Sequence, residues 1–239
     1  MQLKVSKTKL QVAQNFSDYL VDLMESKESI HIALSGGSTP KIVFDELASR
    51  TITEKIWQKV HLYWGDERCV NPDDDDSNYK MTVVHLLSKI EIPEENIHRI
   101  RGENVPDYEA ERYEEILESK LPIINGFPRF DLVILGMGDD GHTASIFPHE
   151  MALWHSEKLC EVAEHPESAQ KRITITGKLI NHAATVAFLV TGENKADKVA
   201  EIIEEKGDYK NYPASLVSPK SGNLLWFLDD AAAAKITSK

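Results

Sequence analysis

Short apolar segments typical of buried strands alternate with amphipathic helical segments along almost the whole chain. The expected strands are 31–34, 60–64, 97–101, 131–135, 172–176, 184–190 and 224–228. The expected helices are 8–25, 41–50, 77–90, 106–120 and 193–205. Strands that alternate with helices predict an α/β fold, in which a mainly parallel sheet carries helices on both faces. No repeat or linker interrupts the pattern, so we expect a single domain over residues 1–239.

The charge and the cysteines restrict the partners and the compartment. The 239 residues include 39 Asp and Glu against 27 Lys and Arg, a formal net charge of −12. Nucleic acids and anionic membranes are polyanions, so we expect neither as a partner and expect a small molecule instead. Cys69 and Cys160 lie far apart, outside any metal-binding spacing, which is typical of free thiols in a reducing compartment. We expect a cytoplasmic monomer or weak oligomer, without signal peptide or membrane span.

Three of the expected strands end in polar clusters, and the carboxyl ends of parallel strands are where ligands bind. The first cluster, Ser35-Gly36-Gly37-Ser38-Thr39, lies between a strand and a helix that Pro40 opens. Glycines let the backbone approach an anion, the hydroxyls can donate to it, and a helix N-terminus adds unpaired N–H groups. The cluster predicts a phosphate cradle, although a glycine turn with a Ser or Thr cap explains it equally well. It matches neither the P-loop nor the dinucleotide-binding pattern.

The second cluster, Gly65-Asp66-Glu67-Arg68, directly follows the strand 60–64. Two carboxylates and a guanidinium at a strand end can hold an oxyanion or orient a base. Taken by itself the cluster is explained better as a solvated ion pair in a loop. The residues alone leave both possibilities open.

The third cluster, at 136–145, follows the strand 131–135 and surrounds Asp140 and His142 with three glycines. The glycines predict a sharp loop that exposes the carboxylate and the imidazole at the rim of a site. Histidine is the side chain that titrates near neutrality without help. His142 is therefore our candidate proton carrier.

Two competing hydrolytic chemistries lack their sequence patterns. The chain has no His-Glu-x-x-His pair and no Cys-His cluster at ligand spacing, so we expect neither a metal nor another cofactor. It also lacks the Gly-x-Ser-x-Gly elbow of serine hydrolases. Water activated by a histidine remains. Arg172 before a strand and Lys195 at a helix start are further candidate cations, although each alone has the pattern of an ordinary surface residue.

Seven segments, in order along almost the whole chain, give it a close resemblance to the bacterial-type 6-phosphogluconolactonases, relatives of glucosamine-6-phosphate deaminase. The matching segments are Ser35-Gly36-Gly37-Ser38-Thr39-Pro40, Gly65-Asp66-Glu67-Arg68, Ser77-Asn78-Tyr79, Leu135-Gly136-Met137-Gly138 with Asp140-Gly141-His142-Thr143-Ala144-Ser145, Arg172-Ile173-Thr174, Gly192 with Lys195-Ala196, and Pro213-Ala214-Ser215-Leu216. The resemblance implies a Rossmann-like fold and cofactor-free hydrolysis of 6-phospho-D-glucono-1,5-lactone to 6-phosphogluconate in the oxidative pentose phosphate pathway.

The resemblance also implies roles for individual residues. His142 would be the base that activates water, Asp140 would support it, and Arg68 would stabilise charge on the lactone carbonyl. The phosphate-binding residues implied in the same way are Gly36, Gly37, Ser38, Thr39, Arg172 and Lys195. One departure is Asp139, where the family usually has proline; we expect this extra carboxylate to leave the reaction intact.

Two rival functions share parts of this pattern. The deaminases have Asp-Glu-Tyr and an Asn-Glu-Pro segment where this chain has Asp66-Glu67-Arg68 and Ile146-Phe147-Pro148. The missing second glutamate argues against ring opening and loss of an amine. A sugar-phosphate sensor without catalysis would keep the cradle but would not need His142 beside it.

Overall fold

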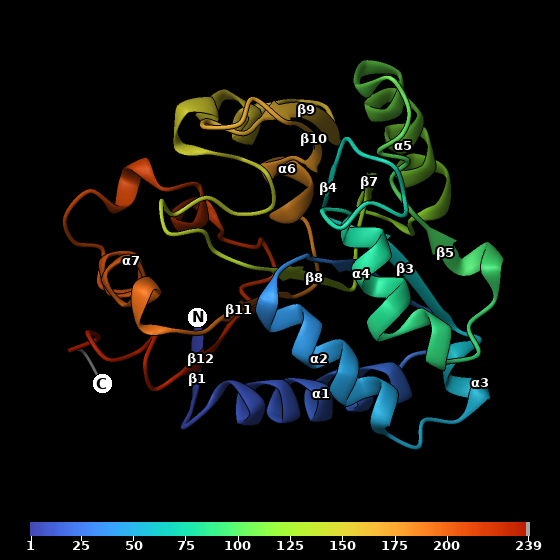
Figure 1. Cartoon of the computed structure of the whole chain (residues 1–239), viewed down its shortest axis with the longest axis horizontal. Coiled ribbons are helices and arrows are strands. Elements are labelled where there is room, and N and C mark those ends of the chain that lie inside the picture. The colour runs from blue at the N-terminus through green and yellow to red at the C-terminus, as the bar shows by residue number, and fades with distance from the viewer. Residues whose placement is uncertain (238–239) are drawn as a thin grey trace.

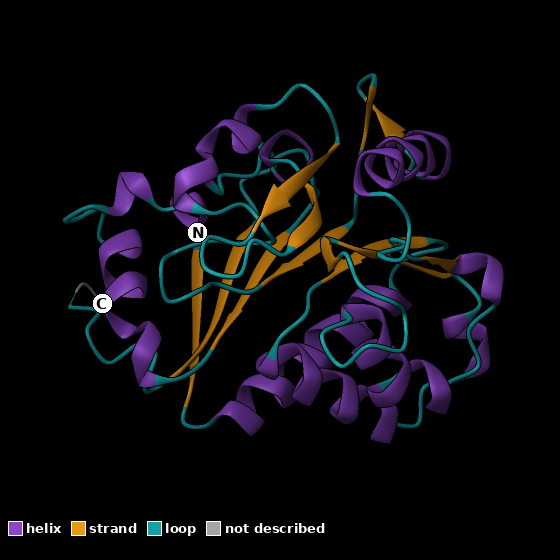
Figure 2. Cartoon of the chain, turned by 45° about the horizontal axis from the view of Figure 1, so that its top comes forward, coloured by secondary structure: helices purple, strands orange, loops and turns teal. Residues whose placement is uncertain are grey.

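The computed structural model describes residues 1–237 and has a seven-stranded sheet at its centre (Figure 1). In spatial order the strands are β1 (Gln2–Ser6), β12 (Leu224–Asp229), β11 (Val186–Val190), β8 (Leu132–Leu135), β2 (Ile30–Leu34), β3 (Val60–Trp64) and β5 (Ile97–His98). Every neighbouring pair in this sheet runs parallel. Helices lie on both sides of the sheet (Figure 2), which confirms the predicted α/β fold.

The helices of the described chain are α1 (Lys9–Glu25), α2 (Ser38–Ser49), α3 (Glu54–Trp57), α4 (Asn78–His85), α5 (Pro106–Lys120), α6 (Gly177–Ile180) and α7 (Ala196–Ile203). Five of them lie at the predicted segments, and the two short helices α3 and α6 were not predicted. Short 3₁₀ segments lie at Leu87–Lys89, Glu94–Asn96, Glu193–Lys195, Tyr209–Asn211 and Pro213–Leu216, and two more follow each other over Pro148–His155 with a kink at Glu150. Helix α1 shows the cause of the pattern: Thr8 caps its first turn, and Val12, Phe16, Leu20 and Met24, four residues apart, are buried.

The order of the strands reverses between β2 and β8. From β2 the chain moves outward to β3 and β5, then returns to β8 on the other side of β2 and moves outward again to β11 and β12. The loops that follow β2 and β8 therefore leave in opposite directions and open a crevice at the carboxyl edge of the sheet. This crevice is where the polar clusters meet.

The strand expected at 172–176 forms, as β10 (Lys171–Ile175), but outside the parallel sheet. It pairs antiparallel with β4 (Asp66–Arg68) on one side and β9 (Cys160–Glu164) on the other. Strand β4 continues from β3 with only Gly65 between them. The small sheet is thus an extension beside the carboxyl end of β3, and antiparallel pairing needs no crossover helix. A two-stranded ribbon joins β6 (Ile123–Ile124) and β7 (Phe127–Pro128).

Other differences from the sequence-based expectation have local causes. Strand β1 was not expected because its residues 2–5 are exposed, so only pairing with β12 stabilises it. The helix expected at 77–90 ends at His85 because the next residue, Leu86, is buried with non-helical dihedral angles (φ −135°, ψ −65°). Helix α7 begins at Ala196, after a 3₁₀ turn, whereas the sequence predicted one continuous helix over 193–205.

The core lies between the sheet and its helices. Phe188 and Trp226 are direct partners on β11 and β12, and their rings stack with centroids 4.0 Å apart. Burial of a large apolar side chain contributes about 1.5–3 kcal/mol, so such cross-strand pairs hold the sheet that carries the site. Across residues 1–237, no helix has both the length and the hydropathy needed to cross a bilayer.

Candidate active site

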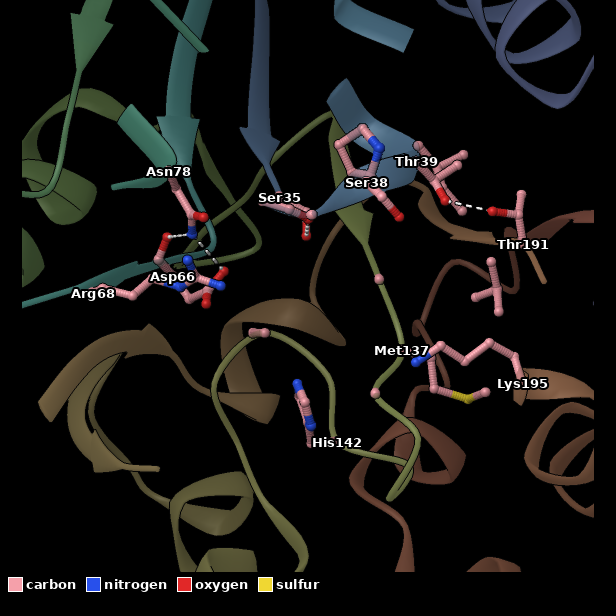
Figure 3. Close-up of a pocket in the computed structure, with 18 of the residues that line it drawn as sticks. Ser35, Ser38, Thr39, Asp66, Arg68, Asn78, Met137, His142, Thr191 and Lys195 are labelled. Atoms are coloured by element: carbon pink, nitrogen blue, oxygen red, sulfur yellow. Dashed lines mark hydrogen bonds between the residues drawn. The ribbon is translucent and has the colours of Figure 1, made fainter. Parts of the chain in front are cut away.

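A cavity of about 300 Å³ opens at the carboxyl ends of β2, β3, β8 and β11 (Figure 3). All but one of the predicted site residues line it: Gly36, Gly37, Ser38, Thr39, Arg68, His142, Arg172 and Lys195. The exception, Asp140, contacts His142 from behind. The three polar clusters therefore converge, as expected from a parallel sheet.

The first cluster builds one wall from the start of α2. Gly37 has φ 106°, a conformation that favours glycine, and helix α2 begins directly after it at Ser38. The first N–H groups of a helix have no acceptor within the helix, so this end of α2 can receive an anion. A side chain at Gly36 would lie 1.9 Å from Asn78 Oδ1, so only glycine fits there. The helix thus starts earlier than the predicted Lys41, within the cradle itself.

Thr39 has a second role that the sequence pattern did not show. Its hydroxyl lies 2.8 Å from the hydroxyl of Thr191, the residue that follows β11. Both side chains are buried. This bond fixes the cradle to the neighbouring strand end, and Thr191 also lines the cavity.

The second cluster divides into two functions because alternate side chains of a strand point to opposite faces. Asp66 and Arg68 line the cavity, whereas Glu67 is buried on the other side and caps α4. Its carboxylate accepts hydrogen bonds from the N–H groups of Asn78 and Tyr79, each 2.8 Å long. Burial raises the pKa of Glu67, and these N–H groups offset part of that effect. Glu67 is therefore a structural residue.

Arg68 and Arg172 are direct neighbours across β4 and β10. Within residues 1–237 neither guanidinium forms an ion pair, and both Nε atoms are buried without an acceptor. Burial, and then the charge of Arg68, lower the pKa of Arg172. The carboxylates of Asp66 and Asp76 act on Arg172 at longer range, and Arg68 Nη1 donates to the Asp76 carbonyl at 2.6 Å. Two adjacent cations without a direct ion pair make this wall suited to an anion or to an oxygen that gains negative charge.

His142 lines the same cavity as Arg68 and Arg172 (Figure 3 labels His142 and Arg68). Its Nδ1 lies 2.6 Å from Asp140 Oδ1, which also accepts the backbone N–H of His142 at 3.0 Å. Burial raises the pKa of Asp140, but the hydrogen bond and charge of His142 outweigh it and lower that pKa to about 2. The ionised carboxylate accepts a hydrogen bond from Nδ1–H, which leaves Nε2 as the free basic nitrogen.

Glycines and one aromatic ring hold this histidine. A side chain at Gly138 would lie 2.1 Å from Nδ1 and 2.6 Å from the Asp140 carboxylate, so only glycine allows their contact. Gly141 has φ 84° and packs against Tyr212, and its carbonyl accepts the N–H of Ala214 at 3.1 Å. The Phe147 ring lies 4.6 Å from the imidazole, centroid to centroid. The loop predicted from the glycines is present.

Lys195 lies on the wall beside Met137, on the side opposite Arg68 (Figure 3). Its ammonium forms an ion pair with Asp139, and Asn194 Nδ2 donates to the same carboxylate at 2.9 Å. The extra carboxylate noted in the sequence therefore contacts the lysine, while Asp140 alone bonds the His142 ring. Among the described residues, no three His, Cys, Asp or Glu side chains gather in a metal-binding cluster.

Comparison with known proteins identifies the family. The model of the glucosamine-6-phosphate isomerase/6-phosphogluconolactonase family matches residues 5–226. The chain belongs to this family. A 6-phosphogluconolactonase of Haemophilus influenzae is 47% identical over 222 residues, which cover 92% of each chain.

Solved structures of similar proteins agree in fold. The crystal structure of the devB protein has a TM-score of 0.93 and 42% identity, and the match covers 99% of both chains. The 6-phosphogluconolactonase from Trypanosoma brucei has a TM-score of 0.86 at 28% identity, and the match covers 99% of this chain and 98% of that one. This chain thus shares the fold of these proteins.

The sequence placed Asp66 in a candidate cluster without indicating its role, and it did not indicate Asn78 or Ser145 as residues of the site. Asp66 and Asn78 line the cavity, and Asn78 Nδ2 donates to the Asp66 backbone carbonyl at 2.9 Å. Ser145 donates to the Asp66 carboxylate at 2.7 Å and so links the second cluster to the third. All three lie within segments that matched the family pattern, so that match was the available signal. Ser77 caps α4, because its side chain accepts the N–H of Lys80 at 3.1 Å.

Proposed function

We propose that this chain hydrolyses 6-phospho-D-glucono-1,5-lactone to 6-phosphogluconate in the oxidative pentose phosphate pathway of the cytoplasm. The observation that carries the proposal is the His142–Asp140 pair at a cavity that two arginines without a direct ion pair and a helix N-terminus border. Relatives that are 42–47% identical are named 6-phosphogluconolactonase, which supports the same substrate here.

In the proposed reaction, Nε2 of neutral His142 removes a proton from water as the water oxygen bonds to the lactone carbonyl carbon. Asp140 keeps the proton on Nδ1 and stabilises the imidazolium that forms. Arg68 stabilises the negative charge on the carbonyl oxygen. The bond between that carbon and the ring oxygen then breaks, and the ring oxygen takes the proton from His142. Each effect contributes roughly 10²- to 10⁴-fold, enough for a lactone that also opens without catalysis.

The phosphate would anchor the substrate at the start of α2, in the cradle of Gly36, Gly37, Ser38 and Thr39. Lys195 and Arg172 would add charge-assisted hydrogen bonds from the two sides. Because the anchor is remote from the reacting carbon, its binding energy orients the carbonyl toward His142. A cavity of about 300 Å³ is at the lower end of the usual range for small-molecule sites, which suits one sugar phosphate.

The test is to offer freshly made 6-phosphogluconolactone and glucosamine 6-phosphate separately to the purified protein. We expect acid release from the lactone above the spontaneous rate, and no ammonia from the amino sugar, because Phe147 stands where the deaminases have glutamate. Ammonia release would move the assignment to the deaminases, and tight binding of both compounds without turnover would favour a sensor. EDTA should leave the lactone rate unchanged; a loss restored by zinc would contradict the metal-free reaction.

A further inference from the structure

One cation of the cavity already has an anionic partner. The Lys195 ammonium pairs with the Asp139 carboxylate, whereas Arg68 and Arg172 on the opposite side have no ion pair within residues 1–237. The Lys195 side chain is 18% exposed and that of Asp139 is 67% exposed. The lysine is thus fixed in the wall, and the aspartate lies at the solvent side of the pair.

Asp139 is placed to reach Lys195 by the loop that also carries the catalytic pair. It lies between Gly138, whose missing side chain admits His142, and Asp140, which bonds His142. Asn194 Nδ2 holds the Asp139 carboxylate from the turn before α7. The Asp139 carboxylate therefore joins the loop after β8 to the turn before α7, through its ion pair with the Lys195 ammonium.

We propose that Asp139 is an internal competitor for the phosphate subsite and a determinant of its affinity. This inference rests on the proposed function, in which Lys195 binds the substrate phosphate. A phosphate that reaches Lys195 must share the ammonium with Asp139 or displace it. Asp139 thereby weakens the binding of every ligand whose phosphate uses Lys195.

The physical reason is the repulsion between two anions that address one cation. An ammonium has three donors and could contact both groups, but the carboxylate and the phosphate would then lie side by side, which is unfavourable. Because Asp139 is mostly exposed, it can move into water at a modest cost. Ion pairs at such exposed positions change a binding equilibrium by about 2- to 10-fold, so the competition would adjust affinity without preventing binding.

The test measures binding of inorganic phosphate and of 6-phosphogluconate by calorimetry, independently of turnover. We expect Asp139→Asn and Asp139→Ala to lower the Kd of both ligands by about 2- to 10-fold. Two substitutions are used because the asparagine keeps the size and the alanine removes the side chain. If Asp139 instead holds Lys195 in its binding position, Kd rises in both variants. An increase or no change overturns the proposal.

Asp197→Asn is the matched control. Like the Asp139 variants it removes one negative charge, but from the surface of α7, where Asp197 pairs with Lys235. It should lower Kd by less than the Asp139 variants do. An equal decrease in Kd would mean that net charge, not competition for Lys195, sets the affinity. In the Lys195→Ala background, Asp139→Asn should lower Kd much less than it does in the wild type, since the ammonium for which the two anions compete is gone. An equally large decrease in Kd in that background overturns the proposal.

Lys195→Ala by itself separates this inference from the proposed function. We expect it to raise the phosphate Kd by at least several-fold. If it does so while the Asp139 variants do not bind more tightly, only the competition is wrong. If Lys195→Ala leaves phosphate binding unchanged, Lys195 does not bind phosphate, and both the competition and that part of the proposed function are wrong.

Discussion

The hydrogen bond between Nδ1 of His142 and Asp140 is the residue-scale feature on which the proposed chemistry depends. A pKa of about 2 keeps Asp140 ionised throughout the physiological range, so its carboxylate only accepts hydrogen bonds. The tautomer of His142 is thereby fixed, with Nε2 free toward the cavity. Gly138 permits this contact, since any side chain there would overlap both groups.

We predict that His142→Asn lowers kcat for the lactone by roughly 10²- to 10⁴-fold, because the base is lost. Asp140→Asn should lower kcat substantially as well, because an amide can donate to Nδ1 and stabilise the wrong tautomer. Steady-state kinetics at one pH near neutrality checks both variants. Wild-type turnover in His142→Asn would mean that another group moves the proton.

At the scale of elements, the pairing of β4 with β10 decides the electrostatics of the site. The register sets Arg68 opposite Arg172 and Glu67 opposite Ile173. Alternation along the two strands then turns both guanidiniums to the cavity and the Glu67 carboxylate away from it. Arg172 lies over the Phe147 ring at 5.5 Å. The like charges and the unpaired Nε atoms are unfavourable for folding and favourable for an anionic ligand.

We predict opposite effects of Arg172→Met on function and on stability. Loss of a charge-assisted contact should lower kcat/KM for the phosphorylated lactone by about 10- to 150-fold. The free energy of unfolding should stay the same or rise by up to about 1 kcal/mol, since the substitution removes a like charge and a buried unpaired donor while keeping an apolar contact to Phe147.

Kinetics and urea unfolding of the same variant check this prediction. Lys171→Met is the control: Lys171 is the neighbour of Arg172 on β10, but it is exposed and pairs with Glu164 at 2.6 Å. It should change neither quantity by more than a few tenths of a kcal/mol. Full activity together with a clear loss of stability in Arg172→Met would show that Arg172 serves the fold.

At the scale of the whole molecule, the carboxyl ends of the strands carry the site and the amino ends carry a histidine ladder. His31 and His61 are partners near the starts of β2 and β3, and their rings stack at 4.6 Å; His98 follows on β5. Burial, together with the charge of His61, lowers the pKa of His31 to about 4, against the opposing effect of Asp131. Burial, with the charges of His61, Lys120 and His31, lowers that of His98 to about 4 as well.

This ladder predicts acid sensitivity of the fold. An unfolded histidine has a pKa near 6.5, so the neutral rings contribute their full stability above pH 6.5, and this is lost as the pH falls from 6.5 through 4. Because solvent screens these half-exposed rings, we expect roughly 1 kcal/mol per histidine at pH 5. When the pH falls from 7.5 to 5.0, the free energy of unfolding of the double variant His31→Phe/His98→Phe should decrease by about 2 kcal/mol less than that of the wild type.

Urea unfolding at the two pH values measures this difference, and comparing each protein with itself removes the packing cost of the substitutions. His155→Phe, at an exposed histidine outside the ladder, should lose as much as the wild type. An equal loss in the ladder variant would mean that other groups cause the acid sensitivity.

The sequence by itself determined the features that depend on neighbours along the chain. The period of apolar residues predicted α1 and the strands β2, β3 and β8, because burial of one face imposes a period of 3.6 or 2 residues or a continuous run. The polar clusters after those strands predicted the site, because parallel strands end at one edge. The glycines around His142 predicted its loop, because the local backbone conformation requires them.

Only the tertiary structure decided which distant residues meet. Strand β10 joins β4 through a register between residues about a hundred positions apart, and no local pattern records such a pairing. The same applies to β1, which is exposed and forms only against β12. Sequence identified Arg68, Arg172, Asp139 and Lys195 as charges, but their partners depend on long-range packing. That packing left the two arginines without a direct ion pair among the described residues and gave Lys195 the carboxylate of Asp139.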